Sequence, residues 1–210
     1  MKRGFMYFMF LFAILVGGVT TAGAQSKAVQ KMVKKTVKEK RKQGWELHAG
    51  TTTLEYALLK YHTYMEEDEE NRISIIGIAM GRNPKIGREN AIAHGISSYS
   101  SRAKSRVVGK LKELLSSTNT NNKIEEIDKF GAAYEIGVNS KIGTLVKQHY
   151  VLKRTGKDGL TEFQVYMSLD ESQAKKARLE AAEEAKRKAA LPELSQDVID
   201  FIGTPVPAED

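Results

Sequence analysis

Cysteine is absent from the 210-residue sequence. No disulfide framework can therefore staple the fold, and no lipid-accepting cysteine can anchor the chain to a membrane. The thiolates that bind zinc in many structural sites are lacking as well. The four histidines lie in four separate segments, without His-x-x-x-His spacing or a carboxylate at ligand spacing (His48, His62, His94 and His149). The sequence therefore predicts no metal site and no cofactor.

Complete motifs for catalysis or nucleotide binding are also lacking. Residues 81–88 resemble a phosphate-binding loop, but Gly87 is followed by Arg88-Glu89 instead of a lysine and a hydroxyl residue. Ser101 and Lys104 match the short pattern Ser-x-x-Lys, yet no partner motif and no nucleophile elbow accompany them. These absences favour a non-enzymatic binding or structural protein, with an enzyme as the alternative.

Residues 1–24 have the order of a cleavable secretory signal peptide. Lys2 and Arg3 form a positive start, an uncharged and mainly apolar stretch follows, and Ala22-Gly23-Ala24 matches the small-x-small pattern before a cleavage site. The apolar stretch is shorter than the roughly 20 residues that span a bilayer. We therefore expect cleavage before Gln25 and a periplasmic or secreted protein without a transmembrane span. An uncleaved membrane anchor is the alternative.

The positive charge of the chain, formally +7, is concentrated in one predicted helix. Valines recur at helical spacing between residues 26 and 43, and basic residues surround them (Lys27, Lys31, Lys34, Lys35, Lys38, Lys40, Arg41 and Lys42). Such a face predicts contact with an anionic surface or another envelope protein. Alternatively, the helix packs through its valines and the lysines are solvated. Nucleic acid is not favoured as a partner, because the basic residues lack interleaved aromatics.

The middle of the chain carries the patterns of strands. Residues 72–81 are apolar on both faces and are expected to lie inside a sheet. Residues 144–153 and 161–169 alternate in polarity on either side of an Asp-Gly turn, which predicts an antiparallel hairpin. In this hairpin His149 is expected to face away from Tyr150.

A long helix is predicted after the first of these strands. Asn83 and Pro84 form a good N-cap and first turn, and apolar residues recur every three or four positions as far as Leu115. Such a helix is on the order of 48 Å long at 1.5 Å per residue. It should therefore overhang a small sheet or bend near Gly95 or Gly109.

Further helices are predicted on either side of this core. Residues 51–53 and Glu55 form a capping-box-like start for one helix, which ends in the acidic residues 66–70, interpreted as a solvated turn. Residues 124–138 predict another helix, but their glycines leave a strand at 133–138 as the alternative.

Residues 170–210 begin with a highly charged stretch and end with a mixture of apolar and polar residues. Asp170 caps a helix that continues to Ala190 and consists almost entirely of Ala, Glu, Lys and Arg. It is expected to project or to lie on the surface through its alanines, which makes it a second candidate contact surface. Residues 195–202 predict a short helical turn that docks through its apolar side chains, and residues 205–210 a flexible tail.

These elements predict an α+β fold with a small, mainly antiparallel sheet and additional N-terminal and C-terminal helices. The organisation divides the chain into a signal peptide, two N-terminal helices, a core domain, and a charged helix with a tail (residues 1–24, 25–71, 72–169 and 170–210). The start of the long helix is a candidate anion site, because its free amides lie near three cations (Arg82, Lys85 and Arg88). With His94 nearby, the same region is where an enzyme or small-ligand site would be expected.

The segments Ile75–Gly81 (IIGIAMG) and Arg88–Val107 (RENAIAHGISSYSSRAKSRV) resemble the strand and alanine-rich helix of the LPP-twenty-type bacterial envelope lipoproteins. Lys147–Leu169 would be the hairpin that ends the domain in that family. The resemblance covers about residues 72–169 and implies a compact α+β envelope domain, often without known enzymatic activity. Gln25 stands where a lipoprotein has its lipid-accepting cysteine, so membrane anchoring does not transfer.

Overall fold

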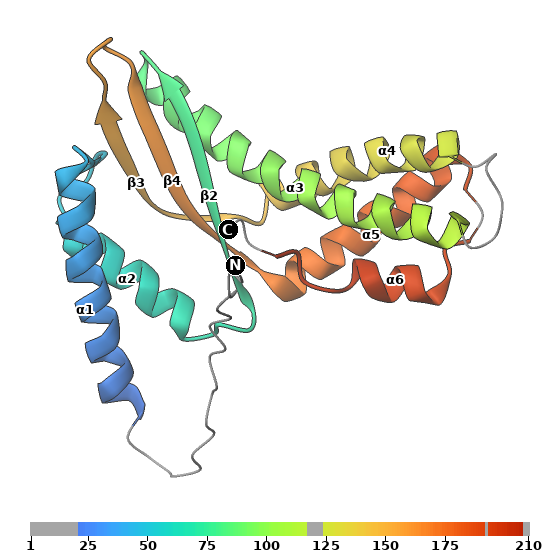
Figure 1. Ribbon diagram of the computed structural model, residues 1–210, viewed down its shortest axis with the longest axis horizontal. Coiled ribbons are helices and arrows are strands. Elements are labelled where there is room, and N and C mark those ends of the chain that lie inside the picture. Colours follow the sequence, from blue (N-terminus) through green and yellow to red (C-terminus); the bar gives the residue numbers. More distant parts are fainter. Residues whose placement is uncertain (1–20, 117–123, 192, 208–210) are drawn as a thin grey trace, which may run out of the picture.

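A computed structural model describes residues 21–116, 124–191 and 193–207. It confirms an α+β fold: in this part of the chain a four-stranded antiparallel sheet is combined with six helices (Figure 1). None of these helices has the length and apolarity that crossing a membrane requires. The predicted signal peptide lies almost entirely outside the described residues.

The sheet has the strand order β1-β3-β4-β2. Its strands are β1 (Glu46–Leu47), β2 (Arg72–Gly81), β3 (Lys147–Thr155) and β4 (Thr161–Asp170). β3 and β4 form the predicted antiparallel hairpin. β2 pairs with β4 along its whole length, from Arg72 opposite Asp170 to Gly81 opposite Thr161.

The prediction that β2 lies inside the sheet is wrong, because β2 is an edge strand. One of its faces packs on the long helix and contains Ile75, which is buried. The opposite face exposes three large apolar side chains (Ile76, Ile78 and Met80). The strand therefore has apolar residues on both faces, although in the described parts of the chain it pairs only with β4.

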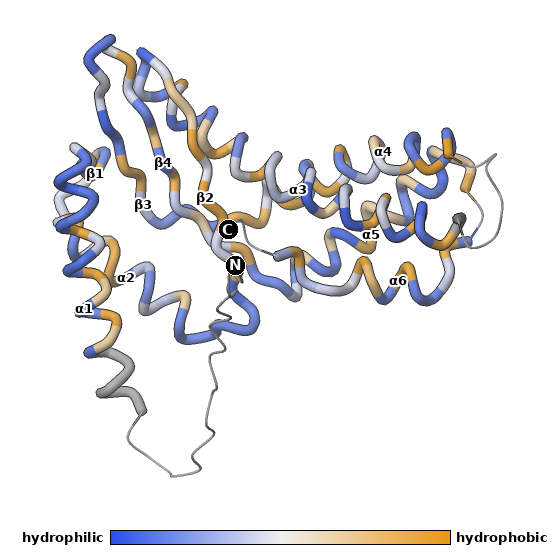
Figure 2. The backbone as a smooth tube through the Cα atoms, in the orientation of Figure 1, coloured by the Kyte–Doolittle hydropathy of each residue, from blue (hydrophilic) through white to orange (hydrophobic). Residues whose placement is uncertain are grey.

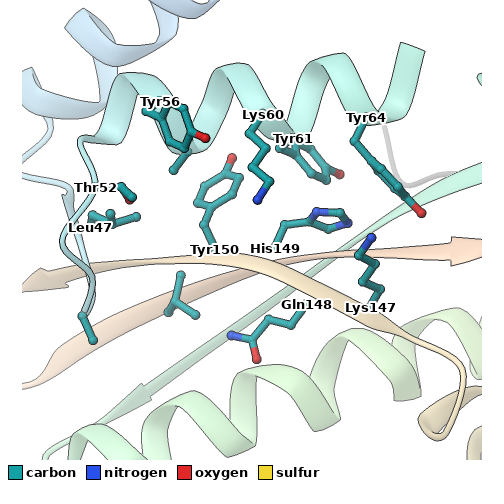
Figure 3. Close-up of a pocket in the computed structure, with 13 residues that line it drawn as sticks. Leu47, Thr52, Tyr56, Lys60, Tyr61, Tyr64, Lys147, Gln148, His149 and Tyr150 are labelled. Atoms are coloured by element: carbon teal, nitrogen blue, oxygen red, sulfur yellow. The ribbon is translucent and has the colours of Figure 1, made fainter. Parts of the chain in front are cut away.

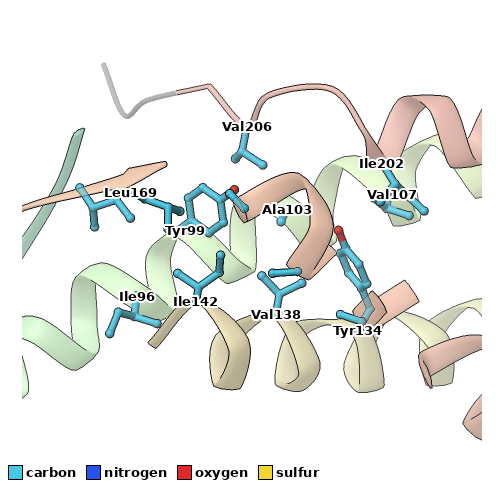
Figure 4. Close-up of a cluster of buried hydrophobic side chains, with 14 of the residues drawn as sticks. Ile96, Tyr99, Ala103, Val107, Tyr134, Val138, Ile142, Leu169, Ile202 and Val206 are labelled. Carbon is cyan, nitrogen blue, oxygen red and sulfur yellow. The ribbon is translucent and has the colours of Figure 1, made fainter. Parts of the chain in front are cut away.

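Helix α3 (Pro84–Ser116) lies across the inner face of the sheet and continues beyond it (Figure 1). This overhang was one of the two arrangements expected from its length. The projecting half packs with α4 (Ile124–Gly143), α5 (Glu171–Ala189) and α6 (Gln196–Ile202). α4 is continuous, so residues 133–138 form a helix and not a strand. Figure 4 shows the core of this bundle between α3, α4 and the C-terminal segment.

Helix α5 does not project; its alanine face is buried within the bundle. The close approach of α4 explains why alanines suffice, since a methyl group added at Gly137 would lie 3.0 Å from the Cβ atom of Ala181. Three charged residues of α5 are buried as well, and Arg178 is the most enclosed, with 1 % of its surface exposed (Glu171, Arg178 and Lys186). This helix is therefore a core element, and only its outer charged side chains remain available for contact.

Arg178 joins four parts of the bundle. Its guanidinium donates hydrogen bonds to the carboxylate of Glu171 (2.5 Å), the hydroxyl of Tyr99 (2.6 Å) and the carbonyl oxygens of Ile202 and Thr204 (both 3.0 Å). The two carbonyl oxygens belong to the end of α6 and the residues after it. The same guanidinium thus satisfies a buried carboxylate and the last carbonyls of a helix, which lack partners within that helix.

The predicted flexible tail is partly wrong. Arg106 on α3 donates hydrogen bonds to the carbonyl oxygen of Pro205 (2.5 Å) and the hydroxyl of Thr204 (2.9 Å). Val206 is buried in the bundle core. The short helix α6 docks as predicted, through Val198 and Ile202. The chain is therefore held as far as Val206, and residues 208–210 lie outside the described range.

Helices α1 (Thr21–Lys42) and α2 (Leu54–Glu66) cover the outer face of the sheet beside β3 (Figure 1). α2 begins at the predicted cap, where the hydroxyl of Thr53 accepts a hydrogen bond from the amide of Tyr56 (3.2 Å). The apolar faces of both helices meet the sheet in a second core (Figure 2). Its buried members come from α1, α2, β3 and the loop after α1 (Val29, Val33, Val37, Trp45, Leu54, Leu58, Tyr61, Tyr150 and Leu152).

Candidate ligand-binding cavity between α2 and β3

A cavity of about 310 Å³ lies between α2, β3 and the loop before α2 (Figure 3). We call it the α2–β3 cavity and define it by its lining residues (Leu47, Ala49, Thr52, Tyr56, Ala57, Lys60, Tyr61, Tyr64, Lys147, Gln148, His149, Tyr150 and Val151). The volume lies at the small end of the roughly 300–1,000 Å³ of small-molecule pockets. It suits a molecule with one or two rings.

An irregularity in β3 shapes this cavity. The pairing of β3 with β4 shifts between Gln148 and Tyr150, which is the signature of a β-bulge. The extra residue places the rings of His149 and Tyr150 on the same side of the sheet, where both contact Tyr61 of α2. The prediction that His149 faces away from Tyr150 is therefore wrong, because strict alternation fails at a bulge.

Tyr61 and Tyr150 line the cavity and pack against a third tyrosine ring, Tyr166. Tyr61 meets Tyr150 and Tyr166 edge-on, with ring centroids 5.6 and 5.9 Å apart, and Tyr150 stacks on Tyr166 at 4.3 Å. Burial raises the pKa of all three hydroxyls above the ordinary value for tyrosine. The rings are therefore neutral near pH 7, and each hydroxyl can donate a hydrogen bond.

The hydroxyls of these tyrosines differ in their partners. Tyr61 donates to the hydroxyl of Ser74 (2.6 Å), and Tyr166 lies 3.3 Å from the side-chain oxygen of Gln164. The hydroxyl of Tyr150 is enclosed and has no hydrogen-bond partner. Tyr150 lines the cavity, and Figure 3 shows its hydroxyl directed toward α2. Buried polar groups are nearly always paired, so this hydroxyl is an exception within the second core.

Replacing Tyr150 with phenylalanine is expected to raise the free energy of unfolding by about 1 kcal/mol, because an unsatisfied buried hydroxyl is removed and the ring remains. Tyr61→Phe is the matched control: it removes a hydroxyl that is hydrogen-bonded and should lower stability by about 1 kcal/mol. Urea denaturation measures both changes. Equal losses of stability in the two variants would contradict the assignment of an unpaired hydroxyl to Tyr150.

Positive charge gathers at one end of the cavity. Lys60 reaches in from α2 and Lys147 from β3 (Figure 3). The ammonium of Lys147 lies 4.3 Å from the ring centroid of Tyr64, and the guanidinium of Arg72 lies 3.8 Å from the same centroid. Arg72 is paired with Glu67 at 3.1 Å. In the described parts of the chain, neither lysine forms an ion pair, and the lining contains no carboxylate.

His149 lies beside these cations. Burial is the main cause that lowers its pKa, to about 4, and Lys147, Lys60 and Arg72 lower it further. Its Nε2 atom is 2.7 Å from the hydroxyl of Ser168. A serine next to a histidine can be a nucleophile and its base, but Ser168 is 2 % exposed, and a histidine with so low a pKa is a weak base at neutral pH. The pair is better explained as a structural hydrogen bond.

The predicted anion-binding residues are exposed at the start of α3 and do not converge on a cavity (Arg82, Lys85 and Arg88). Two of the helix-start amides, those of Lys85 and Ile86, donate to the side-chain oxygen of Asn83 at 2.9 and 3.3 Å. Arg88 donates to the side chain of Gln148 at 2.6 Å. His94 is exposed further along α3, where its Nδ1 atom accepts a hydrogen bond from the amide of Ile78 (3.4 Å).

The predicted contact residues of α1 lie around its outer face, while the valines pack inward. Seven of the eight basic side chains are exposed (Lys27, Lys31, Lys34, Lys35, Lys38, Arg41 and Lys42). Lys40 is an exception: it donates to Gln164 on β4 at 2.8 Å, lies over the Trp45 ring, and has its pKa lowered mainly by burial. Lys40 therefore belongs to the packing between α1 and the sheet.

The residues of the α2–β3 cavity were not singled out from the sequence. Lys60 lies on a predicted helix and Lys147 at the start of a predicted strand, and neither belongs to a motif. If the pairing of β3 with β4 had been predicted with one extra residue at His149, the rings of His149 and Tyr150 would both have been placed against α2. No residue type in this hairpin signals a bulge, so the sequence offers no means of choosing that register.

No group of three or more potential metal ligands comes together in the described parts of the chain. Comparison with known proteins adds no relative: no protein family, curated protein or solved structure matches this chain.

Proposed function

We propose that the protein is an exported, non-enzymatic binding module whose ligand occupies the α2–β3 cavity. The observation that carries the proposal is the lining of the cavity, in which four tyrosines and two lysines surround a space of about 310 Å³ without a carboxylate. The surrounding tyrosines supply flat apolar contact, as in most small-molecule pockets.

A binding role fits the chemistry of the lining better than catalysis does. The cavity has no carboxylate, and its histidine is neutral at pH 7 and hydrogen-bonded to a serine that a substrate cannot reach. A general acid or base works best when its pKa lies near the operating pH. The groups present can hold and orient a molecule, but they do not form a proton-transfer set.

The export part of the proposal comes from the sequence of residues 1–24 and is supported by the resemblance to envelope lipoproteins. In the proposed setting, the exposed basic residues of α1 can contact an envelope protein or an anionic surface. This contact and the cavity lie on different faces of the α1–α2 layer, so a ligand and a partner could bind together.

Small fragments test the proposal. We expect that a panel of one-ring and two-ring fragments, with neutral, basic and acidic members, contains compounds that shift the NMR amide signals of His149 and Tyr150. These compounds should also raise the melting temperature, since a ligand that binds only the folded state stabilises it. Ala57→Phe, which places a ring into the cavity from α2, should abolish both effects.

The controls separate loss of the cavity from loss of the fold. Circular dichroism and the amide spectrum must show that Ala57→Phe is folded; Thr52→Trp, from the loop that borders the cavity, is the second blocking variant. The proposal fails if no fragment shifts the cavity signals, or if the shifts persist in both folded variants.

A further inference from the structure

The charges of the α2–β3 cavity indicate what kind of molecule it takes. Lys60 and Lys147 approach it from opposite sides, one from the helix and one from the strand (Figure 3). Surface lysines are normally solvated, but these two share a concave site whose lining contains no carboxylate. Two cations around one cavity form an arrangement that stabilises an anion.

The positive electrostatic potential of these cations extends into the cavity. Lys147, Lys60 and Arg72 each lower the pKa of His149, so the positive potential extends from both sides to its ring. Arg72 is already paired with Glu67. The charge that remains unbalanced is therefore that of the two lysines.

The rest of the lining favours a flat molecule. Tyr56, Tyr61 and Tyr64 project from α2, and Tyr150 faces them from β3 (Figure 3). Aromatic side chains bind planar rings through offset or edge-on contacts between the rings. Leu47 lies at the end away from Lys147 (Figure 3).

We propose that the cavity binds a flat organic anion of one or two rings, with its acidic group between Lys60 and Lys147 and its rings against the tyrosines. This inference rests on the proposed function, because it names the ligand class of the same cavity. His149 lies next to the acidic group.

Binding of such an anion is coupled to protonation of His149. The bound negative charge offsets the lysines, so the pKa of His149 is higher in the complex than the value of about 4 in the free protein. The complex then binds more protons than the free protein, and affinity rises as the pH falls toward that value. The charged groups that face His149 are Lys60, Arg72 and Lys147, and its other polar neighbours are Tyr61, Tyr64 and Ser168.

Three probes of matched shape test the ligand class. Naphthalene-2-sulfonate keeps its negative charge throughout the pH range of the experiment, naphthalene-2-sulfonamide is its neutral counterpart, and methanesulfonate has the charge without the rings. We expect the aromatic sulfonate to bind at least about tenfold more tightly than either of the others, because charge-assisted hydrogen bonds are lost in one and ring contacts in the other. Isothermal titration calorimetry measures the three affinities.

Variants locate the anion. Lys60→Gln and Lys147→Gln should each weaken binding of the aromatic sulfonate by about tenfold. Lys85→Gln is the control, since this lysine lies at the start of α3 among the cations predicted from the sequence. Loss of affinity in Lys85→Gln but not in the other two would overturn the inference and place the anion at that helix start.

The pH dependence gives an independent readout. Affinity for the sulfonate should rise between about pH 7 and pH 5, with proton uptake measured by calorimetry in buffers of different ionisation enthalpy, and His149→Gln should remove this rise. A pH-independent affinity in the unmodified protein would contradict the placement of the acidic group. Tight binding of the neutral sulfonamide that Ala57→Phe still abolishes would reject the anion class and leave the binding cavity intact.

Discussion

Replacing Gly77 with alanine is expected to lower the free energy of unfolding by about 3 kcal/mol or more, at the upper end of what overpacking costs. A methyl group on Gly77 would lie 1.8 Å from the carbonyl oxygen of Ala91 and 2.7 Å from its carbonyl carbon. Both atoms belong to the backbone of α3, so no side-chain rotation can relieve the overlap. The helix would have to move away from β2, which would open the main core.

A second glycine provides a matched control for this substitution. A methyl group on Gly109, which lies in α3, would have no atom within 4 Å. Gly109→Ala should therefore stabilise the protein by up to about 1 kcal/mol, the difference between alanine and glycine inside a helix. Urea denaturation of both variants measures the contrast. A Gly77→Ala protein as stable as the unmodified protein would show that α3 does not lie against β2 at this glycine.

Replacing Arg178 with methionine is expected to lower the free energy of unfolding by about 3–5 kcal/mol, as when one partner of a buried ion pair is removed. Methionine keeps most of the apolar stem, so the loss comes from the guanidinium. Glu171, which is 8 % exposed, would keep a buried charge without its partner. The carbonyl oxygens of Ile202 and Thr204 would also lose their donor.

Lys176→Met is the control for Arg178. Lys176 is an exposed residue of the same helix, and among the residues that the structure describes its one ion pair is a 4.0 Å contact with Glu180. Its effect should stay within about 0.5 kcal/mol. Besides denaturation, limited proteolysis distinguishes the network from general packing: Arg178→Met should expose the chain after α6 to cleavage at lower denaturant concentration than the control. Equal cleavage in both variants would contradict a role for Arg178 in holding that segment.

Local patterns in the sequence were sufficient to predict most of the elements. Thr53 caps α2, α3 begins at Pro84, and an Asp-Gly turn joins β3 to β4, because capping and turn formation depend on residues that are neighbours in the chain. The α+β class follows from the order of these elements. The short strand β1 was not predicted, since two residues carry no periodicity.

The errors concern partners that are distant in sequence. Ile76, Ile78 and Met80 are apolar, so β2 has the pattern of an interior strand although it lies at an edge. Because alanine is only weakly hydrophobic, the composition of α5 suggests a helix that packs loosely. In the structure, these alanines fit against the surface of α4 that contains Gly137. Both cases depend on the shape of the opposing surface, which composition does not encode.

The candidate site was missed for a related reason. Lys60 and Lys147 are far apart in the sequence, with most of the predicted core domain between them. The tyrosines near them have helical spacing on α2 and strand spacing on β3 and β4. Each tyrosine has an ordinary place in its own element. Only the bulge at His149 brings the polar ends of these residues into one cavity.

The pairing of β2 with β4 affects how this chain can fold during synthesis. Arg72 pairs with Asp170 and Gly81 with Thr161, while α3 and α4 occupy the intervening sequence. The strand β2 therefore emerges from the ribosome long before its neighbour in the sheet, and closure of so large a loop delays the sheet until synthesis is nearly complete. A nascent chain in this condition exposes β2 as an extended apolar segment that a chaperone can hold.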